Sequence, residues 1–129
     1  MKLATVAQFG LRIGGPIVLL LGLVLWTGRA DGLKDIHKRL GIILVLSLWA
    51  LAFAAARAGV PTVLVVVATI WGLIQPVLGL TQENLLTGDW HWVIQVIHLL
   101  VGLGVIGWGE RLGRAIKSAT PAASRLSAS

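Results

Sequence analysis

The sequence predicts an all-α integral membrane protein, a four-helix bundle whose helices run up, down, up and down. Two observations on composition predict the membrane class: 57% of the 129 residues are hydrophobic and only 12% are charged, whereas about a quarter of the residues of a soluble domain are charged. A third observation predicts the number of helices, because a spanning helix needs about 20 apolar residues. Four uncharged runs approach or exceed that length, at residues 13–28, 40–56, 58–82 and 90–109.

The period of the apolar positions within these runs is helical, which argues against a β-barrel. The connections between the runs are short, so consecutive helices should be antiparallel neighbours. We expect a bundle over residues 1–110, and a flexible, cytoplasmic tail over residues 111–129, which are rich in Ala and Ser with scattered basic residues. The expected spans lie at about residues 8–28, 34–57, 61–81 and 89–110.

The composition also excludes several classes of function. The chain contains no Cys, so disulfides, thiolate metal sites, iron–sulfur clusters and covalently attached c-type haem are excluded. The net charge of +6 does not indicate nucleic-acid binding, because the basic residues stand at the ends of the apolar runs and form no patch with aromatic residues. The apolar runs contain no nucleophile motif, no phosphate loop and no carboxylate to pair with a histidine, so hydrolytic chemistry is not expected.

Basic residues predict the orientation of the bundle in the membrane. Cytoplasmic loops carry an excess of Lys and Arg, and acidic residues contribute little to this rule. The end that holds both termini has more bases than the opposite end, so we expect both termini in the cytoplasm and the chain in a bacterial-type plasma membrane. The terminal set is Lys2, Arg12, Arg57, Arg111, Arg114, Lys117 and Arg125, and the opposite set is Arg29, Lys34, Lys38 and Arg39.

Three histidines are the candidate functional residues: His37 in the second span, and His91 and His98 in the fourth. Ionisable side chains inside a membrane are costly and mark a site by default. All three fall in the half of the bilayer away from the termini. At about 100° per residue, His91, Gln95 and His98 share one face of the fourth helix. That face should point into the bundle, because lipid cannot satisfy polar groups.

In an up-down-up-down square the helices form two diagonal pairs; one pair carries histidines and the other carries glycines. Spans two and four are diagonal in an up-down-up-down square, so their inward histidines can face each other across its centre. The other diagonal pair carries glycines seven residues apart, Gly15 and Gly22 in one helix and Gly72 and Gly79 in the other. Glycine lets a backbone approach a helix or a flat ring closely. Opposed histidines flanked by glycines describe a slot for haem, whose iron takes two axial ligands.

This pattern resembles the four-helix core of the b-type membrane cytochromes, over roughly residues 8–109. The resemblance implies one bis-histidine b-type haem, with iron, between the second and fourth helices. That family often holds a second haem, between histidines further along the same two helices. Leu51 and Leu112 occupy those positions here, so at most one haem is expected. The positions that match the family are His37, His98 or His91, Gly22 and Gly79.

The expected depth in the membrane decides whether His91 or His98 is the second iron ligand beside His37. At a rise of 1.5 Å per residue, His37 lies about 9 Å beyond Asp31. His98 lies about 13 Å beyond Asp89, and His91 only about 3 Å beyond it. His98 is also further from water, which suits a buried cofactor. We therefore expect His37 and His98 to bind the iron, and His91 to lie near a haem propionate or on a proton path.

Other residues complete the expected haem site. Gly41 shares the face of the second helix that carries His37. Lys38 and Arg39 stand at the end of that helix where propionates would turn toward water, and they can pair with them. Such a protein would transfer electrons to or from a quinol or a partner redox protein within the lipid bilayer. We expect an electron carrier or a subunit rather than a stand-alone enzyme.

Three alternatives remain open from the sequence. The chain could be a structural or accessory subunit of a larger membrane complex, with no cofactor, in which His98 hydrogen-bonds Gln75 or Gln95. A quinone pocket lined by His98, Gln95 and tryptophans is compatible with a haem site. Mixed His and carboxylate ligands could instead bind Zn, Cu or Mn on the outer side of the membrane. That metal site would gather Asp31, Asp35, His37, Asp89 and His91.

Overall fold

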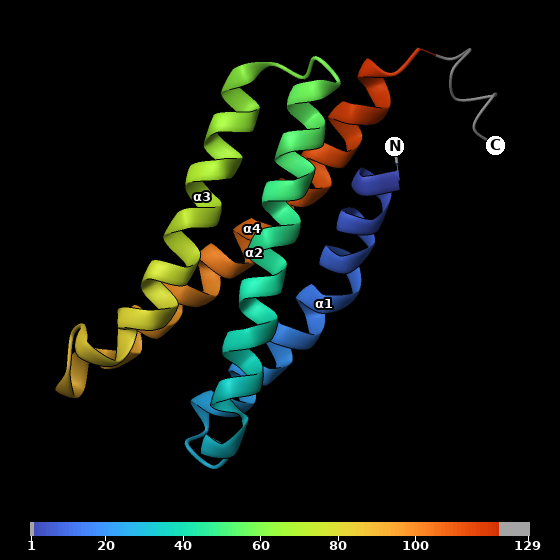
Figure 1. Cartoon of the computed structure of the whole chain (residues 1–129). Helices are drawn as coiled ribbons and strands as arrows, with labels where there is room; N and C mark the ends of the chain where they lie inside the picture. Colours follow the sequence, from blue (N-terminus) through green and yellow to red (C-terminus); the bar gives the residue numbers. More distant parts are fainter. Residues whose placement is uncertain (1, 122–129) are drawn as a thin grey trace.

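The computed structural model describes residues 2–121, which form an all-α bundle of four long helices (Figure 1). Consecutive helices run in opposite directions, so α1 begins and α4 ends at the same end of the bundle, the terminal end. The opposite end, which carries the α1–α2 and α3–α4 connections, is called the open end. The helices are α1 (Lys2–Trp26), α2 (Lys34–Arg57), α3 (Thr62–Thr81) and α4 (His91–Ala119), with 3₁₀ helices η1 (Asp31–Leu33), η2 (Gln82–Asn84) and η3 (Gly88–Trp90) between them.

Each of the four helices, with its adjoining 3₁₀ turns, is long and apolar enough to cross a membrane, with lengths of 25, 27, 23 and 32 residues. Large apolar side chains also cover the outside of the bundle: Val6 and Val63, for example, are 69% and 72% exposed. Continuous apolar surface of this kind is rare on soluble monomers and fits contact with lipid. The structure thus agrees with a multi-pass membrane protein.

The helix bounds differ from the expected spans at both ends of the chain. Helix α1 begins at Lys2 rather than near residue 8, and α4 continues to Ala119. The expectation of a flexible tail from residue 111 is therefore wrong for residues 111–119. The apolar period of α4 continues there, and Leu112 is fully buried against the other helices, so packing extends the helix. Residues 122–129 of the expected tail lie outside the described residues.

The α2–α3 connection shows how the sequence reverses the chain in a few residues. Gly59 has a φ of +78°, in the left-handed region that glycine adopts freely and larger residues avoid. Pro61 follows it and directly precedes α3. Proline lacks a backbone N–H and has a fixed φ, so it suits the start of a helix. The two residues together allow α3 to pack against α2 as its antiparallel neighbour.

The bundle is a flattened square with its core toward the terminal end. Each helix contacts its neighbours in the chain, α1 contacts α4, and α2 contacts α4 across the diagonal, whereas α1 and α3 do not touch within residues 2–121. Leu48, Leu51 and Leu112 are 0% exposed in this core. Leu51 and Leu112, the positions that a second pair of histidines would need, are therefore part of the packed interior.

Polar contacts between the helices lie in the middle of the bundle and toward its terminal end. The indole N–H of Trp49 donates to a backbone carbonyl of α3 at 3.1 Å, and that of Trp71 donates to one of α4 at 2.9 Å. The guanidinium of Arg12 on α1 forms two bonds to the carboxylate of Glu110 on α4, at 2.6 and 2.9 Å. At the open end, a further ion pair joins Lys34 of α2 to Glu83 of η2 at 3.5 Å.

We expect Leu48→Ala to lower the free energy of unfolding by about 2–5 kcal/mol, because truncating a buried leucine leaves a cavity in the core. Leu46, on the outer face of the same helix, is 54% exposed. Leu46→Ala should change the free energy of unfolding by about 0.5 kcal/mol or less. Unfolding of the detergent-solubilised variants, followed by circular dichroism, measures both values. Equal destabilisation by the two substitutions would contradict this placement of the core.

Candidate functional site

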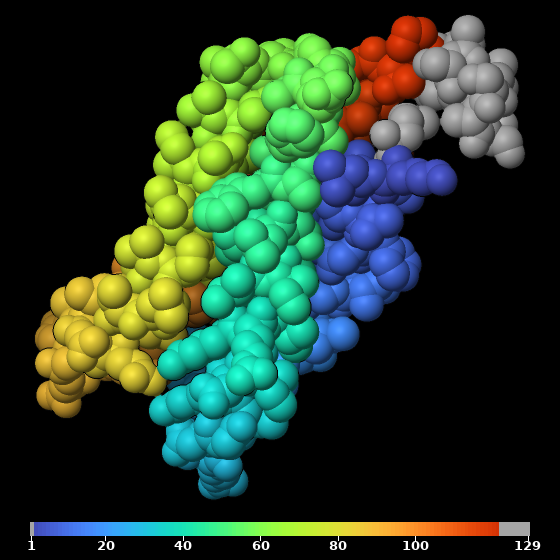
Figure 2. Space-filling view, in the orientation of Figure 1, coloured from blue at the N-terminus to red at the C-terminus, as the bar shows by residue number. Residues whose placement is uncertain are grey.

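A cavity of about 520 Å³ lies at the open end of the bundle. The α1–α2 and α3–α4 hairpins diverge there (Figure 1), and the space-filling view shows the hollow between them (Figure 2). All four helices line the cavity, and Gly15, Leu44 and Val105 line it on the side of the packed core. Its volume is within the range of sites that hold cofactors and other small molecules, about 300–1,000 Å³.

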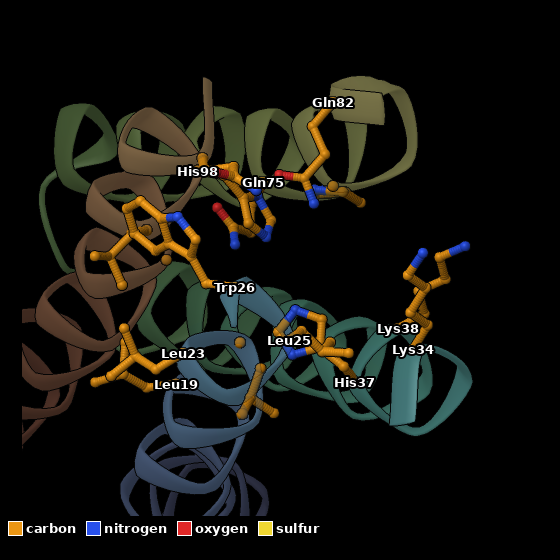
Figure 3. Close-up of a pocket in the computed structure, with 18 of the residues that line it drawn as sticks. Leu19, Leu23, Leu25, Trp26, Lys34, His37, Lys38, Gln75, Gln82 and His98 are labelled. Carbon is orange, nitrogen blue, oxygen red and sulfur yellow. The ribbon is translucent and has the colours of Figure 1, made fainter. Parts of the chain in front are cut away.

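His37 of α2 and His98 of α4 lie across this cavity from each other (Figure 3). The centroids of their imidazole rings are 6.2 Å apart, and the ring planes are inclined by 64°. Each ring projects from the face of its helix that points into the bundle. The structure thus brings together two histidines that are separated by 61 positions in the sequence and stand on diagonal helices.

Each imidazole packs against a glycine of the other helix in its own hairpin. A Cβ atom at Gly22 would lie 3.1 Å from Cε1 of His37, and a Cβ atom at Gly79 would lie 3.1 Å from Cε1 of His98. The two hairpins are therefore alike at the site, and these glycines make room for the rings. Gly41, one helical turn beyond His37, also lines the cavity, and no atom lies within 4 Å of a Cβ placed there.

Three buried polar atoms at this cavity lack a hydrogen-bond partner among residues 2–121: Nδ1 of His37, Nδ1 of His98 and Oε1 of Gln75. The backbone carbonyl of Val18 on α1 approaches the ring of His37, but no hydrogen bond to Nδ1 is completed. A buried polar atom without a partner costs about 1–3 kcal/mol, and such atoms are few in native proteins. Three of them around one cavity are typical of a binding site.

Gln75 lines the cavity but was not among the residues predicted for the haem site; the sequence analysis named it only as a possible hydrogen-bond partner of His98 in the alternative without a cofactor. Among the described residues no hydrogen bond joins it to His98, and its side-chain amide packs instead against α4, where a Cβ at Gly102 would lie 3.1 Å from Nε2. A signal was present in the sequence. Gln75 is the only amide within α3, and it stands one helical turn before Gly79, on the same face of the helix.

His91 also lines the cavity, but it has a partner elsewhere. Its Nδ1 lies 3.2 Å from the backbone carbonyl of Leu85, in the connection between η2 and η3. The next residue, Leu86, has a φ of +47°, a left-handed conformation that is strained for a leucine. The contact therefore holds the start of α4 to a strained connection, whereas Nδ1 of His37 and of His98 have no partner.

Charged side chains stand at the mouth of the cavity. Nζ of Lys34 lies 3.1 Å from Asp31 and 3.5 Å from Glu83, so an ion pair joins the two hairpins across the mouth. Lys38 lines the cavity and forms no ion pair within residues 2–121, whereas Arg39 is exposed and lies outside the lining. Arg39 stands two residues beyond His37, about 200° around the helix, so it points away from the cavity.

The spacing of the two imidazoles can be compared with that of two ligands on opposite sides of one metal ion. Metal–imidazole bonds are about 2.0–2.1 Å long, so rings on opposite sides of one ion have centroids roughly 6 Å apart. The observed 6.2 Å agrees with that distance. Residues 2–121 contain no group of three or more His, Asp or Glu side chains that could hold a metal ion. The residues of the alternative His/Asp metal site thus do not gather into such a group within residues 2–121.

Comparisons of the chain with known protein families, with curated proteins and with solved structures found no match. No family is therefore shown for the chain, and the resemblance to b-type membrane cytochromes remains a prediction. The chain itself provides a bundle of four helices that could each cross a membrane, and a pair of histidines in a cavity at its open end.

Proposed function

We propose that the chain is a membrane protein that binds one b-type haem between His37 and His98 and carries electrons, exchanging them with a quinol or a partner redox protein. The observation that carries the proposal is the imidazole pair, 6.2 Å apart across a cavity of about 520 Å³. That spacing suits two axial ligands of one metal ion, and a porphyrin supplies the four remaining ligands that the cavity lacks.

The imidazole nitrogens of His37 and His98 that have no hydrogen-bond partner within residues 2–121 support this assignment. In a neutral imidazole one nitrogen can bind a metal while the other carries the proton. The buried ring nitrogens without a partner among residues 2–121 are both Nδ1, and in this proposal Nε2 of each ring would bind the iron. Histidines that bind metals usually donate their second N–H to a carbonyl, a carboxylate or water. The Val18 carbonyl, close to the ring of His37, is suited to that role.

The shape and the polarity of the cavity also fit a flat, largely apolar group with an acidic edge. Gly22 and Gly79 keep the backbones of α1 and α3 close behind the rings, and Gly41 leaves open space beside His37. Aliphatic side chains, such as Val18, Leu44 and Ile106, make up about half of the remaining lining. Lys38 at the mouth offers an ammonium group without an ion-pair partner, which could pair with a carboxylate of the bound group.

A bound haem would supply one-electron chemistry, and the chain would determine where that chemistry takes place. Leu48, Leu51 and Leu112 fill the bundle between the cavity and the terminal end, and their full burial excludes water there. The haem edge would be nearest to the surface at the open end, where the cavity lies, so electrons would enter and leave there. The base-rich terminal end favours cytoplasmic termini in a bacterial-type plasma membrane, so that the site would lie in the outer half of the bilayer.

The experiment that tests the proposal is the absorption spectrum of the full chain, expressed with ample haem supply and purified in detergent. We expect a red protein with one haem per chain and a Soret band that shifts when dithionite is added. The pyridine haemochrome of the same sample identifies the haem as b-type. A colourless protein from a haem-replete culture would overturn the proposal and would favour an accessory subunit without a cofactor.

A further inference from the structure

A second cavity, of about 450 Å³, lies at the terminal end of the bundle, where the start of α1, the end of α2 and the end of α4 meet. We call it the terminal groove. The packed leucines of the core separate it from the histidine cavity, and the two cavities share no lining residue. Its walls are mostly apolar, and they include Leu3, Phe53, Ala54 and Ile116.

Arg57 is the charged side chain that lines the terminal groove. Its guanidinium lies 5.9 Å from the centroid of the Phe53 ring, and it forms no ion pair within residues 2–121. The hydroxyl of Thr120, also at the groove, donates to the carbonyl of Ile116 at 2.9 Å. Arg57 therefore supplies the free hydrogen-bond donors of the groove, and a guanidinium has five of them in a fork that matches a phosphate.

The charges around the terminal groove favour an anion. Four of the five acidic residues of the chain belong to the open end. The fifth, Glu110, is paired with Arg12. Lys2 and Arg111 add further positive charge near the terminal end. A second copy of this chain placed end to end would bring like charges together, so it does not suit this surface.

We propose that the terminal groove binds an anionic glycerophospholipid, with the phosphate on Arg57 and an acyl chain along Leu3, Phe53 and Ile116. Basic pockets between membrane helices on the base-rich side of a bilayer hold anionic headgroups. The groove provides the charge for the phosphate and an apolar surface for the chain in one place. This inference does not rest on the haem proposal, because it uses none of the residues of the histidine cavity.

The test is competitive binding to the full chain in detergent, followed by native mass spectrometry, with phosphatidylglycerol and phosphatidylcholine of equal acyl length. We expect the wild-type chain to retain phosphatidylglycerol preferentially. Arg57→Ala should weaken that retention about fivefold, which is the contribution of one basic residue near a lipid phosphate. The matched control is Arg114→Ala, which removes an exposed base of α4 outside the groove and should keep the preference.

Two further measurements distinguish the binding of a lipid from the binding of a simple anion. Ala54→Phe fills the groove without changing its charge, so it should weaken the retention of phosphatidylglycerol. Glycerol phosphate, which lacks acyl chains, should not displace the lipid. Equal losses in Arg57→Ala and Arg114→Ala, or full displacement by glycerol phosphate, would overturn the proposal. Circular dichroism of each variant shows whether the helices are intact, and Arg57→Ala decides the outcome if Ala54→Phe does not fold.

Discussion

Replacement of either His37 or His98 by alanine is expected to leave the purified protein without bound haem. Each imidazole would supply one of the two axial ligands, and residues 2–121 contain no metal-binding group that could replace it. We expect the haem content per chain to fall about tenfold or more, since even residues that only orient a metal ligand contribute about 10–100-fold. The ratio of Soret to protein absorbance, at equal haem supply, measures this loss.

His91→Ala is the matched control, because His91 lines the same cavity but bonds to the connection before α4. This variant should keep most of its haem. The haem-free alanine variants of His37 and His98 should unfold no more easily than the haem-free wild type, because each removes a buried nitrogen without a partner. Loss of colour in His91→Ala alone would show that the ligand pair is wrong.

Gly22→Leu and Gly79→Leu should each abolish haem binding while leaving the four helices intact. A Cβ at either position already lies 3.1 Å from an imidazole carbon, and the larger part of a leucine would enter the space of the ring. Overpacking of this kind costs about 1–3 kcal/mol, and the flexible ring relieves it by rotating away from its partner. The spectrum and the pyridine haemochrome measure haem binding, and circular dichroism measures the helix content.

Gly107→Leu provides the control for adding a leucine to a membrane helix. Gly107 is exposed on α4, and no atom lies within 4 Å of a Cβ placed there, so the new side chain would point into lipid. This variant should bind haem as the wild type does. Full haem binding in both Gly22→Leu and Gly79→Leu would mean that the position of the rings does not determine binding, contrary to the proposed function.

The local pattern of apolar residues along the chain predicted most of the fold. It also predicted which face of each helix carries a candidate ligand. The four apolar runs correspond to the four helices, since hydrophobic length and short connections depend only on neighbouring residues. The end of α4 was predicted less well. The Ala- and Ser-rich composition with scattered basic residues over residues 111–129 suggested a tail, but the burial of Leu112 extends the helix to Ala119. That burial depends on residues of other helices, which a local pattern does not contain.

The sequence by itself determined the number, the direction and the apolar character of the helices. It also determined that His37 and His98 stand on the inward faces of their helices. The helical period decides which residues share a face, and it depends only on neighbouring residues of the chain. Only the tertiary structure decided that the two rings lie 6.2 Å apart, that Gln75 joins their cavity and that Lys38 rather than Arg39 lines it. These results depend on where the two hairpins touch and where they diverge. That geometry is set by contacts between residues far apart in the chain, above all by the leucine core that joins α2 to α4 across the diagonal.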